Sequence, residues 1–477
     1  MFRILHFLYD SRAKAGADIA TIVGERNYGE ILFKRKRLHL LLKDIVANLN
    51  IPAELHYIKS DDDLMRAIET AKSENQPLYY HPAHIIPDPN SFTKLMKKSL
   101  AKEASVMHWS EEPVGYLTWN PDHLKTALLD KKYDQFIKVK APDTFLDIAQ
   151  YQNCLRFISS GFEARFFNNV KMGANNVIKQ SENVPKIKAE HDFYHLLPAE
   201  FKKWFVEPFA FRVQGTAASY SMKRLMVPDV ALQWIHGALT VQKFNDLLNK
   251  IMVFITSRPT KTVDEVLYCQ RRDALYLTKL LERIEQIKKF PVYEKLNNLI
   301  RQGTRYESLQ QLVDTYVALY KAYVLRDSQE RRVVIGHGDL CFSNMLYDTT
   351  ANALRLVDPK GATTEDELWT DALYDFAKLS HSILGDYDWI NNDLFSIQIT
   401  EGNQLNLKIE TDGFNVEPFK EIFIERLRTA GVDMYGIRLY EASLFLSMLP
   451  LHITQEQKLL AFILRAASIL EELQLKD

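Results

Sequence analysis

The segment that most constrains this chain holds two carboxylates and one carboxamide in a fixed order, Asp339, Asn344 and Asp358. Apolar residues separate them, with Met-Leu-Tyr after Asn344 and Leu-Val before Asp358. Asp339 and Asn344 are five positions apart, and Asp358 follows after fourteen more. The longer interval fits a strand from Asn344, a turn at 348–352 and a returning strand at 353–357. The spacing therefore predicts a β-hairpin that brings the three side chains together.

These residue types suit the transfer of a phosphoryl group. That reaction needs an acceptor hydroxyl held in line and a metal that neutralises phosphate charge, with little covalent help from the protein. Mg²⁺ prefers a few hard oxygen ligands, which carboxylates and carboxamides supply. We therefore predict Asp339 as the base or orienter of the hydroxyl, with Asn344 and Asp358 on Mg²⁺. The alternative is an ordinary hairpin whose Asp and Asn residues serve its turns.

The motif His-Gly-Asp-Leu-Cys-Phe-Ser-Asn begins at His337 and is followed by Val-Asp at 357–358. These two motifs resemble the catalytic and metal loops of the aminoglycoside phosphotransferase and choline kinase superfamily. This resemblance implies a protein-kinase-like fold and ATP-dependent phosphorylation of a small-molecule hydroxyl. The Asp-Pro-Lys-Gly continuation at 358–361 is most similar to phosphotransferases of bacterial surface-polysaccharide synthesis. Protein kinases carry Arg after the loop His and Phe-Gly after the metal Asp, whereas this chain has Gly338 and Pro359-Lys360. A protein substrate is therefore not expected.

The resemblance requires a lobe upstream that grips ATP. Strands are expected at 163–170 and 173–180, and an apolar face indicates a helix at 186–197. Lys179 occupies the place of the strand lysine that holds the α- and β-phosphates. Glu190 is the partner that would fix its ammonium group.

A further strand at 217–222 leads to the expected hinge, so adenine is expected to bond to backbone near Met222 and Lys223. Residues 159–161 and 171–175 are both candidates for the loop that covers the phosphates. Neither has the Gly-x-Gly-x-x-Gly pattern, so we assign no phosphate ligand there.

Two residues are expected to support the catalytic loop. His337 opens it, and in the resembled family an Asp braces it from behind. Asp375 is the better match for that Asp and Asp371 the second, both within a helix expected at 371–379, whose acidic start favours the positive end of the helix dipole.

The acceptor implied is a sugar or polysaccharide precursor, choline or another amino alcohol. A choline-type acceptor needs an aromatic or acidic cage. Candidates for it are Trp369, Tyr374, Asp386, Tyr387, Asp388 and Trp389. Lys360 and His381 are candidates to face the substrate, against the alternatives of a solvated loop lysine and a core histidine.

The first 155 residues predict a separate α/β domain with a mostly parallel sheet. Expected strands (3–8, 53–58, 77–81) alternate with expected helices (38–49, 61–74, 91–100). The arrangement is similar to nucleotidyltransferases acting on sugars, with 78–88 and Asp147 at the places of their metal loop and second metal Asp. His84 stands where an Asp is expected and a Gly-rich nucleotide loop is missing. We therefore expect a degenerate domain that binds a nucleotide-sugar or mediates assembly as a homo-oligomer.

The expected organisation is thus this α/β domain at 1–155, followed by a two-lobed α+β kinase-like domain. Its N-lobe is expected at 156–225 and its mainly helical C-lobe at 226–477. Sixty basic against sixty-one acidic residues give a net charge of −1, so no nucleic-acid partner is expected. The basic run at 34–37 is expected to begin a helix.

Three cysteines lack metal-ligand spacing, which favours a reducing cytoplasm. No stretch reaches the roughly 18 apolar residues of a membrane helix, so no membrane insertion is expected. Besides a small-molecule kinase, two classes stay open: a bifunctional nucleotidyltransferase-kinase and a pseudokinase scaffold in a biosynthetic pathway. The missing glycine loop counts against the first. The intact set of Lys179, Asp339, Asn344 and Asp358 counts against the second.

Overall fold

A computed structural model describes residues 4–33, 36–110, 112–141, 144–161, 169–172, 175–326 and 330–475. The chain divides into two compact units, Met1–Glu163 and Ala164–Asp477. The expected boundary after residue 155 falls inside helix α6 (Tyr151–Gly161), so the division lies a few residues further along the chain.

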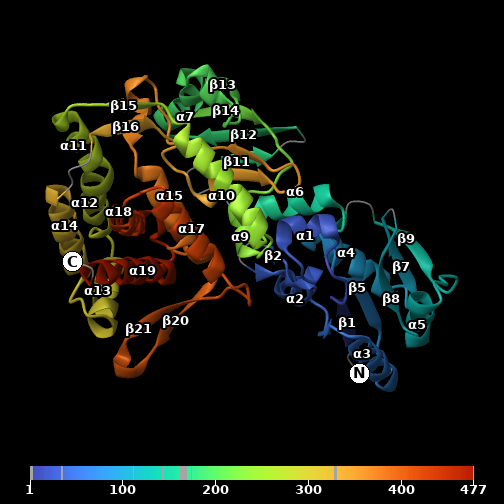
Figure 1. The fold of residues 1–477 in the computed structure, drawn as a ribbon. Coiled ribbons are helices and arrows are strands. Elements are labelled where there is room, and N and C mark those ends of the chain that lie inside the picture. Colours follow the sequence, from blue (N-terminus) through green and yellow to red (C-terminus); the bar gives the residue numbers. More distant parts are fainter. Residues whose placement is uncertain are drawn as a thin grey trace. The chain divides into compact units, whose positions relative to one another are not determined.

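A six-stranded sheet forms the centre of the first unit (Figure 1). Its strand order is β4 (Ala53–Ile58), β1 (Leu5–Asp10), β5 (Leu78–Pro82), β8 (Pro113–Thr118), β7 (Val106–Trp109) and β9 (Ile137–Lys140). The pairs β1–β4, β1–β5 and β7–β9 are parallel, while β5–β8 and β7–β8 are antiparallel. The expectation of a mostly parallel sheet in a mixed α/β fold is confirmed.

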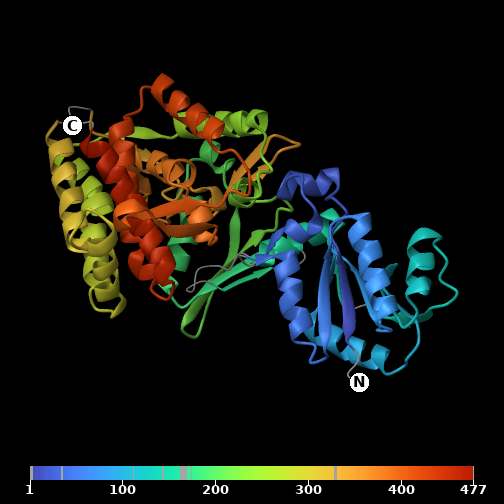
Figure 2. The same ribbon diagram turned by 90° about the horizontal axis from the view of Figure 1, so that it is seen from below.

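Helices lie on both sides of these strands (Figure 2). They are α1 (Ala17–Val23), α2 (Leu38–Ala47), α3 (Asp61–Ser73), α4 (Pro89–Leu100) and α5 (Pro121–Leu129). At the start of helix α3, the Ser60 side chain accepts a hydrogen bond from the Asp63 amide, and the Asp63 side chain accepts one from the Ser60 amide. This reciprocal pair is a capping box. Its apolar residues then recur every three to four positions and pack against Leu8 and Ile58 of the sheet.

The basic run at 34–37 does not begin a helix. Lys36–Arg37 form the short strand β3, which pairs with β2 (Leu32–Phe33), and residues 34 and 35 lie outside the described part of the chain. A second small pair joins β6 (Ile85–Pro87) to β10 (Phe145–Asp147), so the two segments compared above with nucleotidyltransferase metal loops are neighbours.

The second unit begins with a four-stranded antiparallel sheet in the order β11 (Asn169–Met172), β12 (Asn176–Ser181), β14 (Ala217–Lys223) and β13 (Pro208–Gln214). Helix α7 (Val184–Leu196) packs on it, with Ile187 buried against Ala218 and Tyr220. The strand and helix expected around Lys179 and Glu190 are present within a few residues of their expected bounds.

The remainder of this unit is mainly helical. Its helices are α8 (Ala199–Lys202), α9 (Val230–Ile235), α10 (Val241–Thr256), α11 (Glu265–Asp273), α12 (Lys279–Ile287), α13 (Val292–Gly303), α14 (Leu309–Arg326), α15 (Tyr374–Ile383), α16 (Tyr387–Asn391), α17 (Glu417–Thr429), α18 (Met434–Ser447) and α19 (Glu456–Gln474). A single π-helical turn, Ala274–Thr278, joins α11 to α12. Leucine, isoleucine and aromatic side chains of α12, α13, α14, α18 and α19 share one large core. None of the helices in the described ranges is long and apolar enough to cross a membrane.

Three small β elements complete the unit: the sheet β15 (Thr260–Thr262), β16 (Arg332–Ile335) and β19 (Trp369–Asp371), the hairpin β17 (Met345–Asp348) and β18 (Ala353–Leu356), and the hairpin β20 (Phe395–Ile399) and β21 (Leu405–Ile409). The hairpin predicted after Asn344 is confirmed. The helix expected at 371–379 was placed too early: Asp371 ends β19, where it pairs with Val333, and α15 begins at Tyr374.

Candidate active site

Asp375 holds the loop that carries Asp339. Its Oδ2 accepts the His337 amide at 3.0 Å and its Oδ1 accepts the Gly338 amide at 2.9 Å. Arg258 Nη1 lies 3.2 Å from Oδ2, and the Asp375 side chain is fully buried. Hydrogen bonds to an ionised group are stronger than neutral ones. The first turn of α15 therefore fixes the direction of the loop, in the place predicted for the bracing Asp.

Asp371, the second candidate for that brace, has other partners. Its carboxylate accepts the hydroxyls of Tyr268 at 2.9 Å and Tyr276 at 2.8 Å and the Leu373 amide at 2.9 Å. It stabilises the packing of α11 and the π-helical turn against β19.

His337 joins the two halves of the candidate site. Its Nε2 donates to the Val357 carbonyl at 2.9 Å, and its Nδ1 accepts the Asp339 amide at 3.2 Å. The ring stacks on Phe205, with centroids 5.8 Å apart and planes 7° apart. Burial lowers the pKa of His337, so the imidazole is neutral, as these bonds require. The imidazole ring of His337 therefore connects Val357, the residue before Asp358, to Asp339.

Asn344 and Asp358 stand at the open end of the β17–β18 hairpin. Met345 pairs with Leu356, and the Val357 amide donates to the Asn344 carbonyl at 3.0 Å. Asn344 Nδ2 donates to the Asp339 carbonyl at 2.9 Å, which leaves the side-chain oxygen without a hydrogen-bond partner among the described residues.

Asp358 has a left-handed backbone, with φ 55°, and its side chain is 39% exposed. The exposed carboxylate and the Asn344 carboxamide oxygen are hard donors of the kind that Mg²⁺ takes. The residues present therefore fit this cation.

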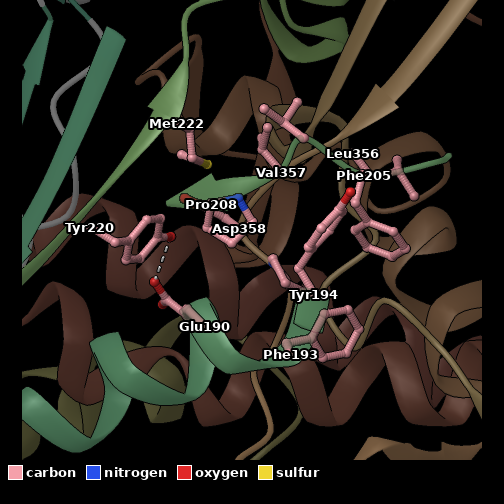
Figure 3. A pocket seen from close by; sticks show the side chains of 12 residues that line it. Glu190, Phe193, Tyr194, Phe205, Pro208, Tyr220, Met222, Leu356, Val357 and Asp358 are labelled. Atoms are coloured by element: carbon pink, nitrogen blue, oxygen red, sulfur yellow. Dashed lines mark hydrogen bonds between the residues drawn. The ribbon is translucent and has the colours of Figure 1, made fainter. Parts of the chain in front are cut away.

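Lys179 lies between two carboxylates. Its Nζ is 2.7 Å from Glu190 Oε2 and 3.0 Å from Asp358 Oδ1, and Lys179 and Glu190 are 3% and 5% exposed. The Tyr220 hydroxyl donates to Glu190 Oε2 at 3.2 Å (Figure 3). Burial opposes the charge of Lys179, but the Asp358 and Glu190 carboxylates outweigh it and raise its pKa. The lysine stays protonated.

A small pocket opens beside this ion pair (Figure 3). Its walls come from α7, the end of β14 and the end of β18, and include Phe193, Tyr194, Tyr220, Met222, Val357 and Pro359. Met222 thus lines the pocket, and Lys223, which ends β14, is exposed.

Of the two candidates for a phosphate-covering loop, one belongs to a helix and the other is described only in part. Residues 159–161 end α6 in the first unit and so form no loop. Residues 171 and 172 end β11, and residues 173 and 174 lie outside the described part of the chain.

Lys378 was not anticipated from the sequence. It stands one turn after Asp375 on α15, and its Nζ lies 2.8 Å from Asp339 Oδ1. Burial opposes its charge, but the Asp339 carboxylate outweighs burial and raises the pKa of Lys378. The available signal was the i, i+3 spacing of Asp375 and Lys378, which puts both on one helix face.

Three of the candidates for an ammonium cage have other partners or belong to the core. Asp386 is paired with Lys420 at 3.1 Å and Arg465 at 2.6 Å. Tyr387 and Trp389 belong to the core, and the His381 ring is 1% exposed and stacks on Tyr387. His381 is therefore a core histidine, which was the alternative given for it above.

No protein-family model matches the chain, and no curated protein matches it. Among solved structures it is similar to a thermostable mutant of aminoglycoside phosphotransferase APH(4)-Ia, with 12% identity and a TM-score of 0.38, over 65% of this chain and 93% of that one. A glucosamine kinase gives 11% identity and a TM-score of 0.38, over 68% and 84%. A fructosamine-3-kinase candidate from Haemophilus somnus 129PT gives 10% and 0.36, over 68% and 96%. At these values the likeness carries no functional argument.

Proposed function

We propose that the protein transfers the γ-phosphoryl group of ATP to a hydroxyl group of a small molecule. The observation that supports this most is the contact of Lys179 with both Glu190 and Asp358. Lys179 and Glu190 come from a strand and the helix that follows it, whereas Asp358 comes from a loop much later in the sequence. A buried ion pair costs desolvation free energy, and an ordinary hairpin needs no such cluster.

We propose the following roles for the site residues. Asn344 and Asp358 would hold Mg²⁺, which would neutralise the charge of the nucleotide phosphates. Lys179, aligned by Glu190, binds phosphate oxygens, and adenine bonds to backbone near Met222 and Lys223. Asp339 accepts the proton of the acceptor hydroxyl, while His337 and Asp375 keep its loop in place.

Sequence motifs support three further parts of this proposal. The acceptor is a small molecule because Gly338 and Pro359-Lys360 depart from the protein-kinase pattern. The enzyme serves surface-polysaccharide synthesis in a bacterial cytoplasm. The first unit, with a nucleotidyltransferase-like arrangement, binds a nucleotide-sugar or mediates homo-oligomer formation rather than turning over a nucleotide.

Calorimetric titration with Mg²⁺ and AMP-PNP tests the proposal. Wild-type protein should bind it, and Lys179→Met should lose that binding. Lys188→Met is a matched control, because Lys188 is exposed on helix α7, which also carries Glu190, and pairs with Asp192. Binding of CTP or UTP in place of ATP would support a nucleotidyltransferase instead. Failure of wild-type protein to bind Mg²⁺-nucleotide would contradict the kinase.

A further inference from the structure

Three side chains with metal-binding atoms lie together in the first unit. His6 comes from β1, and Glu54 and His56 come from the neighbouring strand β4. His6 pairs with Glu54 in the parallel register. Because side chains alternate along a strand, all three lie on one face of the sheet. One ligand atom from each lies within 4.8 Å of the others. Two adjacent strands thus bring two imidazoles and one carboxylate together.

The two imidazole rings meet nitrogen to nitrogen. His6 Nδ1 lies 2.9 Å from His56 Nε2, and the ring planes are 14° apart. Two nitrogens that each bind one tetrahedral Zn²⁺ at the usual bond length are separated by about 3.3 Å. The adjustment needed is therefore a few tenths of an ångström. The His56 side chain, which is 19% exposed, can make it by a small rotation.

Glu74 sets the direction of the His6 ring. Its Oε2 lies 3.1 Å from His6 Nε2, and Glu74 is the residue at which helix α3 ends. A carboxylate only accepts hydrogen bonds, so Nε2 carries the hydrogen, and a neutral His6 ring has its lone pair on Nδ1, toward His56. Histidines that bind metals in proteins usually donate their other ring nitrogen to a carboxylate or carbonyl in this way.

The alternative is a hydrogen-bond chain without an ion, in which His56 Nε2 donates to His6 Nδ1. That chain gives no role to Glu54. Glu54 Oε1 lies 3.8 Å from His56 Nε2, which is too far for a hydrogen bond. The Glu54 side chain is 60% exposed and can rotate to complete a ligand set. Two imidazoles and one carboxylate are the donors of zinc sites that keep a fourth position for water.

We propose that His6 Nδ1, His56 Nε2 and a Glu54 carboxylate oxygen bind Zn²⁺, with water as the fourth ligand. Binding replaces the hydrogen between the two imidazoles, and the His56 ring then carries its hydrogen on Nδ1. Imidazole nitrogen suits Zn²⁺, whereas Mg²⁺ takes oxygen ligands. This site therefore differs in chemistry from the one proposed at Asn344 and Asp358, and it does not depend on the kinase function.

The position of the site indicates a structural role. His6 is the second residue of β1, whereas ligands of open α/β sheets bind outside the carboxyl ends of the strands, where Asp10 stands. The site shares no residue with 78–88 or Asp147, the segments compared with nucleotidyltransferase metal loops. The ion would join β1 to the edge strand β4 and, through Glu74, to helix α3. We therefore expect zinc to stabilise the first unit.

The test is a calorimetric titration of the full chain with ZnCl₂ at pH 8, after removal of metal with EDTA and in excess Mg²⁺. The excess Mg²⁺ fills sites that have only oxygen ligands. We expect one Zn²⁺ per chain and a higher melting temperature of the protein with zinc than without it. Co²⁺, used as a second probe, should give the intense visible absorption of a four-coordinate ion.

His56→Gln should weaken Zn²⁺ binding by about tenfold or more and abolish the Co²⁺ absorption. Glu54→Gln changes an exposed side chain, so the fold is kept, and it should weaken Zn²⁺ binding as well. His123→Gln is the matched control, because His123 lies on α5 and its Nδ1 bonds to Ser105 at 2.9 Å. All three variants should bind Mg²⁺-AMP-PNP as wild type does. Absence of Zn²⁺ binding by wild-type protein, or unchanged binding by either of the first two variants, would overturn the inference and leave the kinase proposal standing.

Discussion

The ammonium group of Lys378 lies 2.8 Å from Asp339 Oδ1, so the carboxylate proposed as the base already faces a buried cation in the free protein. A nearby positive charge favours the ionised form of a carboxyl group. The pair therefore keeps Asp339 ready to accept a proton and restricts its orientation.

Replacing Lys378 should change the pH profile of the reaction. In Lys378→Met the Asp339 carboxylate loses the cation that favours its ionised form, so the acid limb of kcat/KM should move to higher pH. We expect kcat to fall about 100-fold, while Lys378→Arg should restore part of it. Steady-state ATP consumption from pH 5 to 9 measures both. An unchanged acid limb would show that Lys378 only packs.

Asp339→Asn should separate binding from chemistry. The variant keeps the shape of the side chain but loses the proton acceptor, so turnover should drop by roughly 10²- to 10⁴-fold. Binding of Mg²⁺-AMP-PNP should stay within about twofold of wild type, because the ion pairs that hold Lys179 are with Glu190 and Asp358. Full turnover by this variant would exclude Asp339 as the base.

Asp375→Ala should destabilise the second unit strongly. It leaves Arg258 buried without its carboxylate and two loop amides without their acceptor, and breaking a buried pair costs about 3–5 kcal/mol. Asp366→Ala is the control, since the 71% exposed Asp366 side chain forms a surface pair with Arg271 worth about 1 kcal/mol or less. Urea unfolding followed by circular dichroism compares the two. Equal losses would contradict a special role for Asp375.

Sequence patterns predicted the structural features that depend on residues close together in the chain. The interval between Asn344 and Asp358 predicted the hairpin, and the apolar spacing of Ile187 and Phe193 predicted α7. Asn344 and Asp358 flank the hairpin, so hairpin geometry brings these two together, whereas the loop of Asp339 is also held by Asp375.

Contacts between distant segments could not be read in the same way. Lys378 sits in a run that looks like an ordinary amphipathic helix, and only the packing of α15 under the loop brings it to Asp339. From the sequence, Asp386 was a candidate to bind a ligand. In the structure its carboxylate pairs with Arg465 of α19, which is 79 positions away. The start of α15 was misplaced because the pairing of Asp371 with Val333 outweighs its favourable position at a helix start.

Stability should depend on pH through Asp388. Burial raises the pKa of this carboxyl to about 7, and its Oδ2 has no hydrogen-bond partner among the residues described. A raised native pKa means that the unfolded chain releases this proton first, so stability falls as pH rises from about 4 to about 7.

Asp388→Asn removes this titration. The variant should be more stable than wild type at pH 8 by on the order of 4 kcal/mol and equal to it near pH 4. Chemical unfolding at both pH values measures the difference. A constant difference between the two proteins across that range would show that Asp388 does not titrate in the native state.

Helix α15 holds the catalytic loop through Asp375 and contacts the proposed base, Asp339, through Lys378. Both contacts therefore come from one helix. A displacement of this helix carries the loop and the cation along in step, and the separation of Lys378 from Asp339 is insensitive to it. Lys179 and Glu190 ride on other elements. Lys179 nevertheless contacts Asp358, and His337 joins the residue before Asp358 to Asp339. The lysine proposed to bind phosphate and the proposed base are therefore connected through the loop that α15 holds.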